Sequence, residues 1–441
     1  MIKKLGLNFY NKKFYELKKR IFFVFFALVI FRIASFIPIP GINTDIFSNV
    51  LNKHQNTMID MLNIFSGGSL NRASILALGI TPYISASIII QLLTFINSYF
   101  IGLKKEGELG RIKIKRYTKY ATLFLSIIQA IGFSIGLPNL HGMNGLIINS
   151  DFHFYFVSVI SLITGTLFLM WMGDLITSKG IGNGTSFIIF IGIISGFPSA
   201  ILKTIYKFQT SKMNIYIFII MFFFVFIVTF LVVFIERSYR KIIIYYSRRQ
   251  NMIYKNISQT SHIPLKINMS GVMPAIFASS LLLFPSTISS WFNIKFQNNF
   301  FVFVLNYFKP GQPLYVFLYT LSIIFFCFFY SNLVFDPRET ANNLKKSGAF
   351  LLGIRPGEKT ANYISNIMSK INIIGSIYIA VICLLPDFMR NIMDVPFYFG
   401  GTSLLIVVVV IIDFLSQIQT LMISTKYNSL IKKSSLNLKK F

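Results

Sequence analysis

Ten apolar runs, each about 16–24 residues long and nearly free of charge, constrain the fold of this 441-residue chain most strongly. They start near Ile21, Ala73, Tyr120, Phe154, Gly184, Met213, Ile267, Gln312, Ile371 and Val395. Each run is long enough to cross a hydrocarbon core as a helix. A soluble fold could not hide this much apolar surface, because 54% of the residues are hydrophobic and only 13% are charged. We therefore predict an all-α polytopic membrane protein with ten transmembrane helices.

Basic residues are divided unevenly among the segments that join these runs. The segments on the side of the two termini carry 33 Lys and Arg residues, whereas the loops on the opposite side carry 8. Loops rich in Lys and Arg stay in the cytoplasm, so we predict that both termini are cytoplasmic. The net charge of +28 also suits the cytoplasmic loops to anionic lipid, RNA or an acidic protein surface.

Two short patterns occur once in each half of the chain. The pattern Gly-x-x-Pro-x-Ile-x-Ala-Ser begins at Gly79 in the second run and again at Gly271, 192 positions later, in the seventh. The pattern Gly-Thr-Ser-x-x-Ile begins at Gly184 in the fifth run and at Gly401 in the tenth. Coincidence between ordinary membrane helices is the alternative explanation. Helix-breaking residues at matching places favour two inverted five-helix halves with the functional site between them.

This symmetry and the charge pattern predict five consecutive parts of the chain. They are a cytoplasmic tail 1–20, an N-terminal half 21–203, an extracytoplasmic hinge loop 204–212, a C-terminal half 213–425 and a cytoplasmic tail 426–441.

Residues 57–70 do not fit the pattern of spans. This segment is amphipathic and helix-like, but it is too short to cross a bilayer, and it ends in the pair Gly67-Gly68. A short element at membrane depth must be surrounded by protein or by a water-filled cavity. The residues alone leave two interpretations open, a surface helix in an extracytoplasmic loop and a re-entrant stopper in a channel mouth.

Catalytic and metal-binding patterns are absent from the sequence. It contains no nucleotide-binding loop, zinc-protease motif or nucleophile elbow. Cys327 and Cys383 lie in apolar runs and form no CxxC pair. We therefore predict no enzyme activity, catalytic residue, cofactor or metal. The main rival, an ion-coupled carrier, needs buried charges near the midplane, and Arg32 and Asp413 provide little of this.

Longer runs of sequence resemble the SecY family, the channel subunits of the bacterial protein translocase, and its proteobacterial form in particular. These runs are Phe36–Gly41, Phe65–Gly68, Gly79–Gln91, Lys104–Glu108, Gly180–Gly184, Pro264–Asn268, Pro337–Ala341, Gly353–Gly357 and Pro396–Val410. The resemblance implies a channel that passes unfolded polypeptides across the inner membrane. It also implies that apolar segments leave sideways into lipid between the second and seventh spans, and that residues 57–70 are a re-entrant plug.

The resemblance assigns four sets of site residues. The constriction ring would be Ile80, Ile84, Thr185, Ile189, Ile276 and Ile406. The plug would include Asp60, Met61, Asn63, Ile64, Phe65, Ser66, Gly67 and Gly68. The lateral gate would include Ser85, Ser87, Gln91, Pro274 and Ser279. The docking residues for a motor or ribosome would be Arg338, Arg355, Arg248 and Arg249, in the loops 236–268 and 336–370.

The implied partners are SecE-like and SecG-like small membrane subunits, the SecA ATPase, the ribosome at its rRNA, secretory and membrane protein substrates, and the lipid bilayer. Thr185 departs from the family, which usually has an aliphatic residue at this position of the ring. An exposed hydroxyl there would ease wetting of the constriction, unless it bonds back to a carbonyl one turn earlier.

Overall fold

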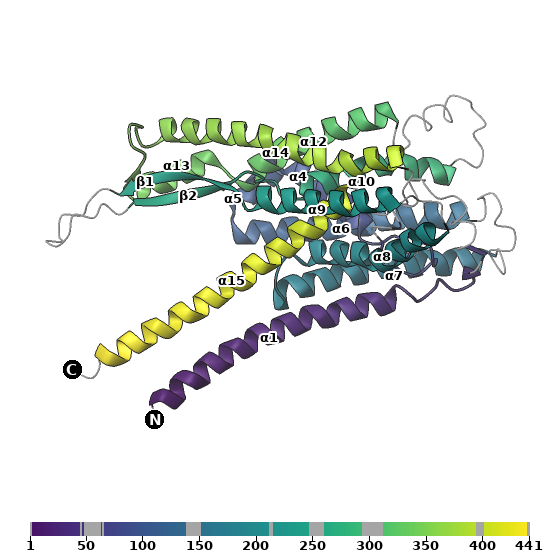
Figure 1. Cartoon of the computed structure of the whole chain (residues 1–441), viewed down its shortest axis with the longest axis horizontal. Coiled ribbons are helices and arrows are strands. Elements are labelled where there is room, and N and C mark those ends of the chain that lie inside the picture. Colours follow the sequence, from purple (N-terminus) through teal and green to yellow (C-terminus); the bar gives the residue numbers. More distant parts are fainter. Residues whose placement is uncertain are drawn as a thin grey trace. The chain divides into compact units, whose positions relative to one another are not determined.

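The computed structural model describes residues 2–44, 46–47, 63, 66–137, 151–210, 215–246, 260–292, 312–393 and 401–438 (Figure 1). Its helices are α1 (Ile2–Ala34), α4 (Thr81–Ile96), α5 (Ser98–Lys105), α6 (Glu108–Gly136), α7 (Phe152–Lys179), α8 (Gly184–Gln209), α9 (Ile215–Glu236), α10 (Met273–Phe292), α12 (Pro313–Val334), α13 (Pro337–Lys346), α14 (Glu358–Met393) and α15 (Gly401–Leu438). Its strands are β1 (Tyr239–Tyr246), β2 (Thr260–Lys266) and β3 (Ala349–Phe350).

Each of the ten predicted apolar runs overlaps a described helix, and the protein is a multi-pass membrane protein. Within the described ranges, 7 helices are long and apolar enough to cross a membrane. The pair α4 and α5, which is bent by 94°, would make an eighth. The predicted first run lies in α1, and the seventh lies in α10, where residues Met273–Leu282 form a shorter apolar helix. The mostly helical fold is confirmed, while the count of ten spans stays a prediction.

The second and seventh runs begin as turns and not as helices. We predicted spans from Ala73 and Ile267, but the helices begin at Thr81 and Met273. The segment before α4 pairs with the chain after α1, since the Ile39 backbone N–H donates to the Ala73 carbonyl over 2.8 Å. An apolar run indicates which residues lie within the membrane, but not that all of them are helical. Here the first residues of both runs form irregular backbone, which is tolerated at that depth where protein surrounds it.

The predicted connecting segments are more helical than expected. Residues 204–209 of the predicted hinge loop continue α8, and the predicted tails 1–20 and 426–441 largely belong to α1 and α15. Residues 199–209 contain neither Gly nor Pro, so nothing in them stops the helix.

A three-stranded sheet, in the order β2-β1-β3, is the main element that the sequence analysis did not predict. β1 and β2 are antiparallel, with Tyr239 opposite Lys266, and Tyr246 of β1 pairs with Ala349 of β3. Side chains alternate along β1, so that Ile242 and Ile244 point inward. They join a buried apolar cluster with residues that include Leu265, Leu351, Ile364, Ile367 and Ile371, which fixes the sheet on α14.

The chain divides into two compact units. The first consists of Met1–Tyr206, Ser280–Pro310 and Val410–Phe441, and the second of Lys207–Ser279 and Gly311–Val409. In the first unit α6 packs against α4 and α7, and α1 packs against α7. In the second unit α14 packs against α12 and α13. The division into symmetric halves at 204–212 stays a prediction, because compactness does not measure symmetry.

Candidate functional site

The first repeated pattern forms the same local structure in both places. Gly79 and Gly271 have φ values of +57° and +62° and stand two residues before the first residues of α4 and α10. This left-handed conformation suits glycine and cannot continue a right-handed helix. Pro82 and Pro274 follow as the second helical residues, where a missing N–H costs nothing. The pattern therefore encodes a turn at the glycine that is followed directly by a helix with proline in its first turn.

The pattern continues with matched burial inside the two helices. The Ile84 N–H donates to the Ile80 carbonyl over 3.1 Å, and the Ile276 N–H donates to the Val272 carbonyl over 3.2 Å. Ala86 and Ala278, which are equivalent in the two copies, are both fully buried.

The second repeated pattern marks close contacts between helix backbones. A Cβ added to Gly184, at the start of α8, would lie well under 3.0 Å from the Gly173 carbonyl oxygen of α7. A Cβ added to Gly401, at the start of α15, would lie equally close to the Cys383 carbonyl oxygen of α14. Small residues let membrane helices approach in this way. The repetition is visible in the sequence, but its role in helix packing is not.

Five of the six predicted ring residues are buried isoleucines. They are Ile80, Ile84, Ile189, Ile276 and Ile406, and each side chain is at most 7% exposed. Ile80 and Ile84 occupy one turn at the start of α4, and Ile189 lies in α8; these elements belong to the first unit. Ile276 of α10 and Ile406 of α15 belong to the second unit. Their common role as a ring stays a prediction.

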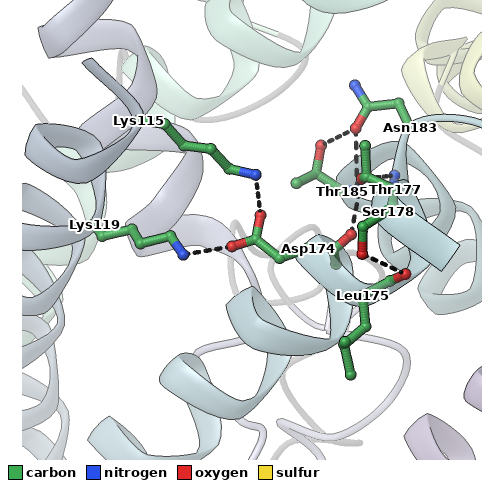
Figure 2. A network of polar contacts seen from close by, with 10 residues as sticks. Lys115, Lys119, Asp174, Leu175, Thr177, Ser178, Asn183 and Thr185 are labelled. Atoms are coloured by element: carbon green, nitrogen blue, oxygen red, sulfur yellow. Dashed lines mark hydrogen bonds and ion pairs between the residues drawn. The ribbon is translucent and has the colours of Figure 1, made fainter. Parts of the chain in front are cut away.

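Thr185, the sixth predicted ring residue, pairs its hydroxyl with a neighbouring side chain through an exposed hydrogen bond. Its Oγ1 donates to Asn183 Oδ1 over 2.8 Å, and the same oxygen accepts the Thr185 backbone N–H at 3.2 Å (Figure 2). The alternatives considered from the sequence were an unpaired hydroxyl and a bond to a carbonyl one turn earlier. Asn183 directly precedes α8. Its side-chain oxygen therefore caps the start of the helix and binds the threonine hydroxyl at the same time.

This contact changes the effect expected of Thr185→Ile. From the sequence we expect a modestly tighter resting seal, because one polar group among five isoleucines would leave the constriction. Since Asn183 already pairs the hydroxyl, we expect the resting ion conductance in planar bilayers to fall by no more than about twofold, since a paired hydroxyl adds little to wetting. A much larger fall would show that the hydroxyl faces water in the resting channel.

A charged network lies beside this turn in the first unit. Asp174 of α7 faces two lysines of α6, with Lys115 Nζ at 2.6 Å from Oδ1 and Lys119 Nζ at 2.6 Å from Oδ2 (Figure 2). The two lysines are one helical turn apart, so one carboxylate can engage both. Nearby, Thr177 Oγ1 accepts the Gly184 N–H over 2.9 Å. The two ion pairs join α7 to α6, whereas the Thr177 bond fixes the junction between α7 and α8, which carries Thr185.

The described end of the predicted plug is buried. Asn63 and Ser66 are 6% and 3% exposed, and Asn63 Oδ1 accepts the Asn71 N–H over 3.1 Å. The Gly67 carbonyl accepts a hydrogen bond from Ser195 Oγ of α8 at 3.0 Å. Gly68 belongs to the same turn. The remaining predicted plug residues, Asp60, Met61, Ile64 and Phe65, lie outside the described residues.

The predicted gate residues lie on two helices. Ser85, Ser87 and Gln91 lie on α4, where Gln91 Nε2 donates to Ser87 Oγ over 3.1 Å. Pro274 and Ser279 lie on α10, where Ser279 Oγ donates to the Ile276 carbonyl over 2.9 Å. The hydroxyl of Ser279 is thereby satisfied within its own helix.

Two of the four predicted docking arginines are described, and both are exposed. Arg338 lies in the first turn of α13, which Asp336 caps by accepting the Arg338 N–H over 2.8 Å. Arg355 lies in the turn before α14, where its carbonyl accepts Thr360 Oγ1 over 2.9 Å. Arg248 and Arg249 lie outside the described residues.

Known proteins match this chain over nearly its full length. The family model described as SecY matches residues 74–415. The chain is 60% identical to the protein translocase subunit SecY of Buchnera aphidicola subsp. Schizaphis graminum, over 99% of this chain and 100% of the relative. It is 56% identical to that of Escherichia coli strain K12, over 99% of each chain.

Solved structures share the fold. A structure described as a protein conducting channel is similar with a TM-score of 0.67 and 18% identity, and the match covers 93% of each chain. The Sec61 channel of the canine ribosome–channel complex is similar with a TM-score of 0.64 and 17% identity, again over 93% of each chain. The family model covers more than half of the chain, and the bacterial relatives share more than half of its residues over nearly the full length. The chain belongs to the SecY family.

Proposed function

We propose that this protein is the protein-conducting channel of a bacterial Sec translocase. The observation that carries the proposal is the near full-length identity of 60% and 56% to two bacterial translocase subunits. The protein would lie in the inner membrane with both termini in the cytoplasm, as the 33 to 8 division of basic residues favours. Its partners would be SecE-like and SecG-like subunits, a SecA motor and the ribosome.

The chemistry of the candidate ring supports a passive channel. A pore for unfolded chains must bind no sequence strongly, so its constriction should be aliphatic and deformable and should gate by dewetting. Five isoleucines and a threonine with a paired hydroxyl meet that requirement. A secondary carrier would instead need convergent polar or charged ligands near the midplane. The energy for transport would come from the motor.

Reconstitution tests this proposal directly. We expect proteoliposomes that contain the chain with a SecE-like subunit to import an unfolded precursor only when a SecA ATPase and ATP are added. The small subunit should also co-purify with the chain from native membranes. Uptake of a small solute down an ion gradient, without precursor transport, would favour the carrier instead.

The plug assignment has its own test. Deleting residues 60–67 should leave a folded channel that conducts small ions at rest at least about tenfold more than the wild type, because a hydrated pore loses its stopper. The deletion removes the Gly67 contact to Ser195 but leaves the spans intact. The measurement is resting conductance in planar bilayers, with thermal unfolding as the check on folding. A folded deletion variant with wild-type conductance would refute the plug role.

A further inference from the structure

The two ends of the β1–β2 hairpin meet at a buried pair of side chains in the second unit. α9 ends at Glu236, just before β1, and Asn268 follows just after β2 (Figure 1). Asn268 Nδ2 donates to Glu236 Oε1 over 2.6 Å. Asn268 and Glu236 are only 3% and 7% exposed. The pair therefore closes the base of the hairpin away from water.

Asn268 also fixes the connection that leads into α10. Its Nδ2 donates to the Gly271 carbonyl over 3.1 Å, and its Oδ1 accepts Ser270 Oγ over 3.1 Å. The Ile267 N–H, which precedes it, donates to the Ser238 carbonyl over 3.2 Å and extends the hairpin ladder to this point. One carboxamide thus binds the hairpin base and the turn that starts α10.

The connection is too well bonded to act as a flexible linker. A hydrogen bond to a buried carboxylate is stronger than one between neutral groups, so losing it costs more than losing a neutral bond. The turn itself is defined, because Gly271 adopts a left-handed conformation with φ +62°. A displacement of the hairpin should therefore reach the first turn of α10, since Asn268 is bonded to Gly271, two residues before that helix.

We propose that Glu236 and Asn268 are positioning residues that transmit movement of the β1–β2 hairpin to α10. The inference rests on the proposed function, in which the motor docks on the loop 236–268 and α10 borders the lateral gate. Docking would then open the gate through this pair, and neither residue would touch the motor or the transported chain.

Spin labels can separate docking from opening. We would place one label at Ile89 of α4 and one at Leu281 of α10, which are 46% and 47% exposed. Their distance is measured in nanodiscs with and without a SecA ATPase and a non-hydrolysable ATP analogue, and the affinity of the ATPase is measured in parallel. In the wild type the distance distribution should shift on docking.

The variants are chosen to break and restore the pair. Asn268→Asp places two carboxylates together and should reduce the docking-induced shift in population at least about fivefold, with ATPase affinity within about twofold of wild type. Glu236→Gln keeps an oxygen acceptor and should behave like the wild type. The double variant, Glu236→Gln with Asn268→Asp, exchanges the carboxylate and the carboxamide between the two positions. The carboxamide can again donate to the carboxylate, but an aspartate at position 268 has no N–H for the Gly271 carbonyl, so this variant should recover part of the shift.

Asn372→Ala is the matched control. Asn372 is a buried carboxamide of the same unit, and its Nδ2 donates to Ser331 Oγ over 2.7 Å. The variant therefore loses a buried side-chain hydrogen bond between helices α14 and α12 without touching the hairpin base. Its docking-induced shift should stay at the wild-type value.

The possible outcomes distinguish failure of the inference from failure of the proposed function on which it rests. A wild-type shift in Asn268→Asp, or the same loss in Asn372→Ala, would overturn the inference and leave the proposed function standing. Failure of the double variant to recover any of the shift while it stays folded would also overturn it, because the bond between positions 236 and 268 would then not matter. Absence of any shift in the wild type on docking would refute the gated channel and the inference with it.

Discussion

Arg355→Glu should block motor-driven export while the channel still inserts and folds. The side chain is exposed in the turn before α14, so reversing its charge removes no buried contact. Loss of one partner of a charge pair at an interface typically costs about 2–5 kcal/mol, which corresponds to more than a tenfold loss of affinity. We therefore expect the export rate in reconstituted vesicles to fall at least about tenfold. Thermal unfolding and recovery of the small partner subunit should stay at wild-type values.

Arg111→Glu provides the matched control for this charge reversal. Arg111 is an exposed arginine of α6 on the predicted cytoplasmic side, outside the four docking residues. Export by this variant should stay within about twofold of wild type, since surface substitutions change stability little and no partner is expected there. Equal loss in both variants would indicate a general effect of negative charge. Degradation of Arg355→Glu would show that the residue serves folding and not docking.

The length of the apolar runs and the charge of the loops predicted the membrane architecture well, because both are strong physical signals. A run without charge must lie in hydrocarbon or in a protein core, and the ten runs overlap helices from α1 to α15. The repeated patterns at Gly79 and Gly271 also identified equivalent places before their structure was known. Their positive φ values explain why the same residues recur.

Individual side-chain contacts are harder to predict from the sequence than the membrane spans. Asn183 stands where a helix cap is expected, but its residue type does not say that it also binds the Thr185 hydroxyl. The bond between Glu236 and Asn268 joins residues on either side of a hairpin that was read as a loop. The run of β-branched and aromatic residues Ile242–Tyr246 does favour a strand, but it is too short and too close to charged residues to count as a span.

The close approach of backbones at the second repeat gives the largest stability effect that we expect. Gly184 begins α8 against the Gly173 carbonyl of α7, and its N–H donates to Thr177 Oγ1 across the turn that joins the two helices. An added methyl group under 3.0 Å from that oxygen cannot be accommodated by a side-chain movement, because the obstacle is backbone. The helices must separate or the turn must distort. Overpacking of this kind costs about 1–3 kcal/mol and sometimes more.

Gly184→Ala should therefore lower the unfolding temperature in detergent by at least about 5 °C and reduce the amount of protein in the membrane severalfold. Gly401→Ala should act in the same direction, because its added Cβ would meet backbone oxygens of α14 equally closely. Gly196→Ala in the same helix as Gly184 is the control, since an added Cβ there meets nothing within 4 Å. Alanine favours a helix over glycine, so this variant should unfold at or slightly above the wild-type temperature. Wild-type stability in Gly184→Ala would mean that α7 and α8 part easily, and the shared Gly-Thr-Ser pattern would then need a reason other than packing.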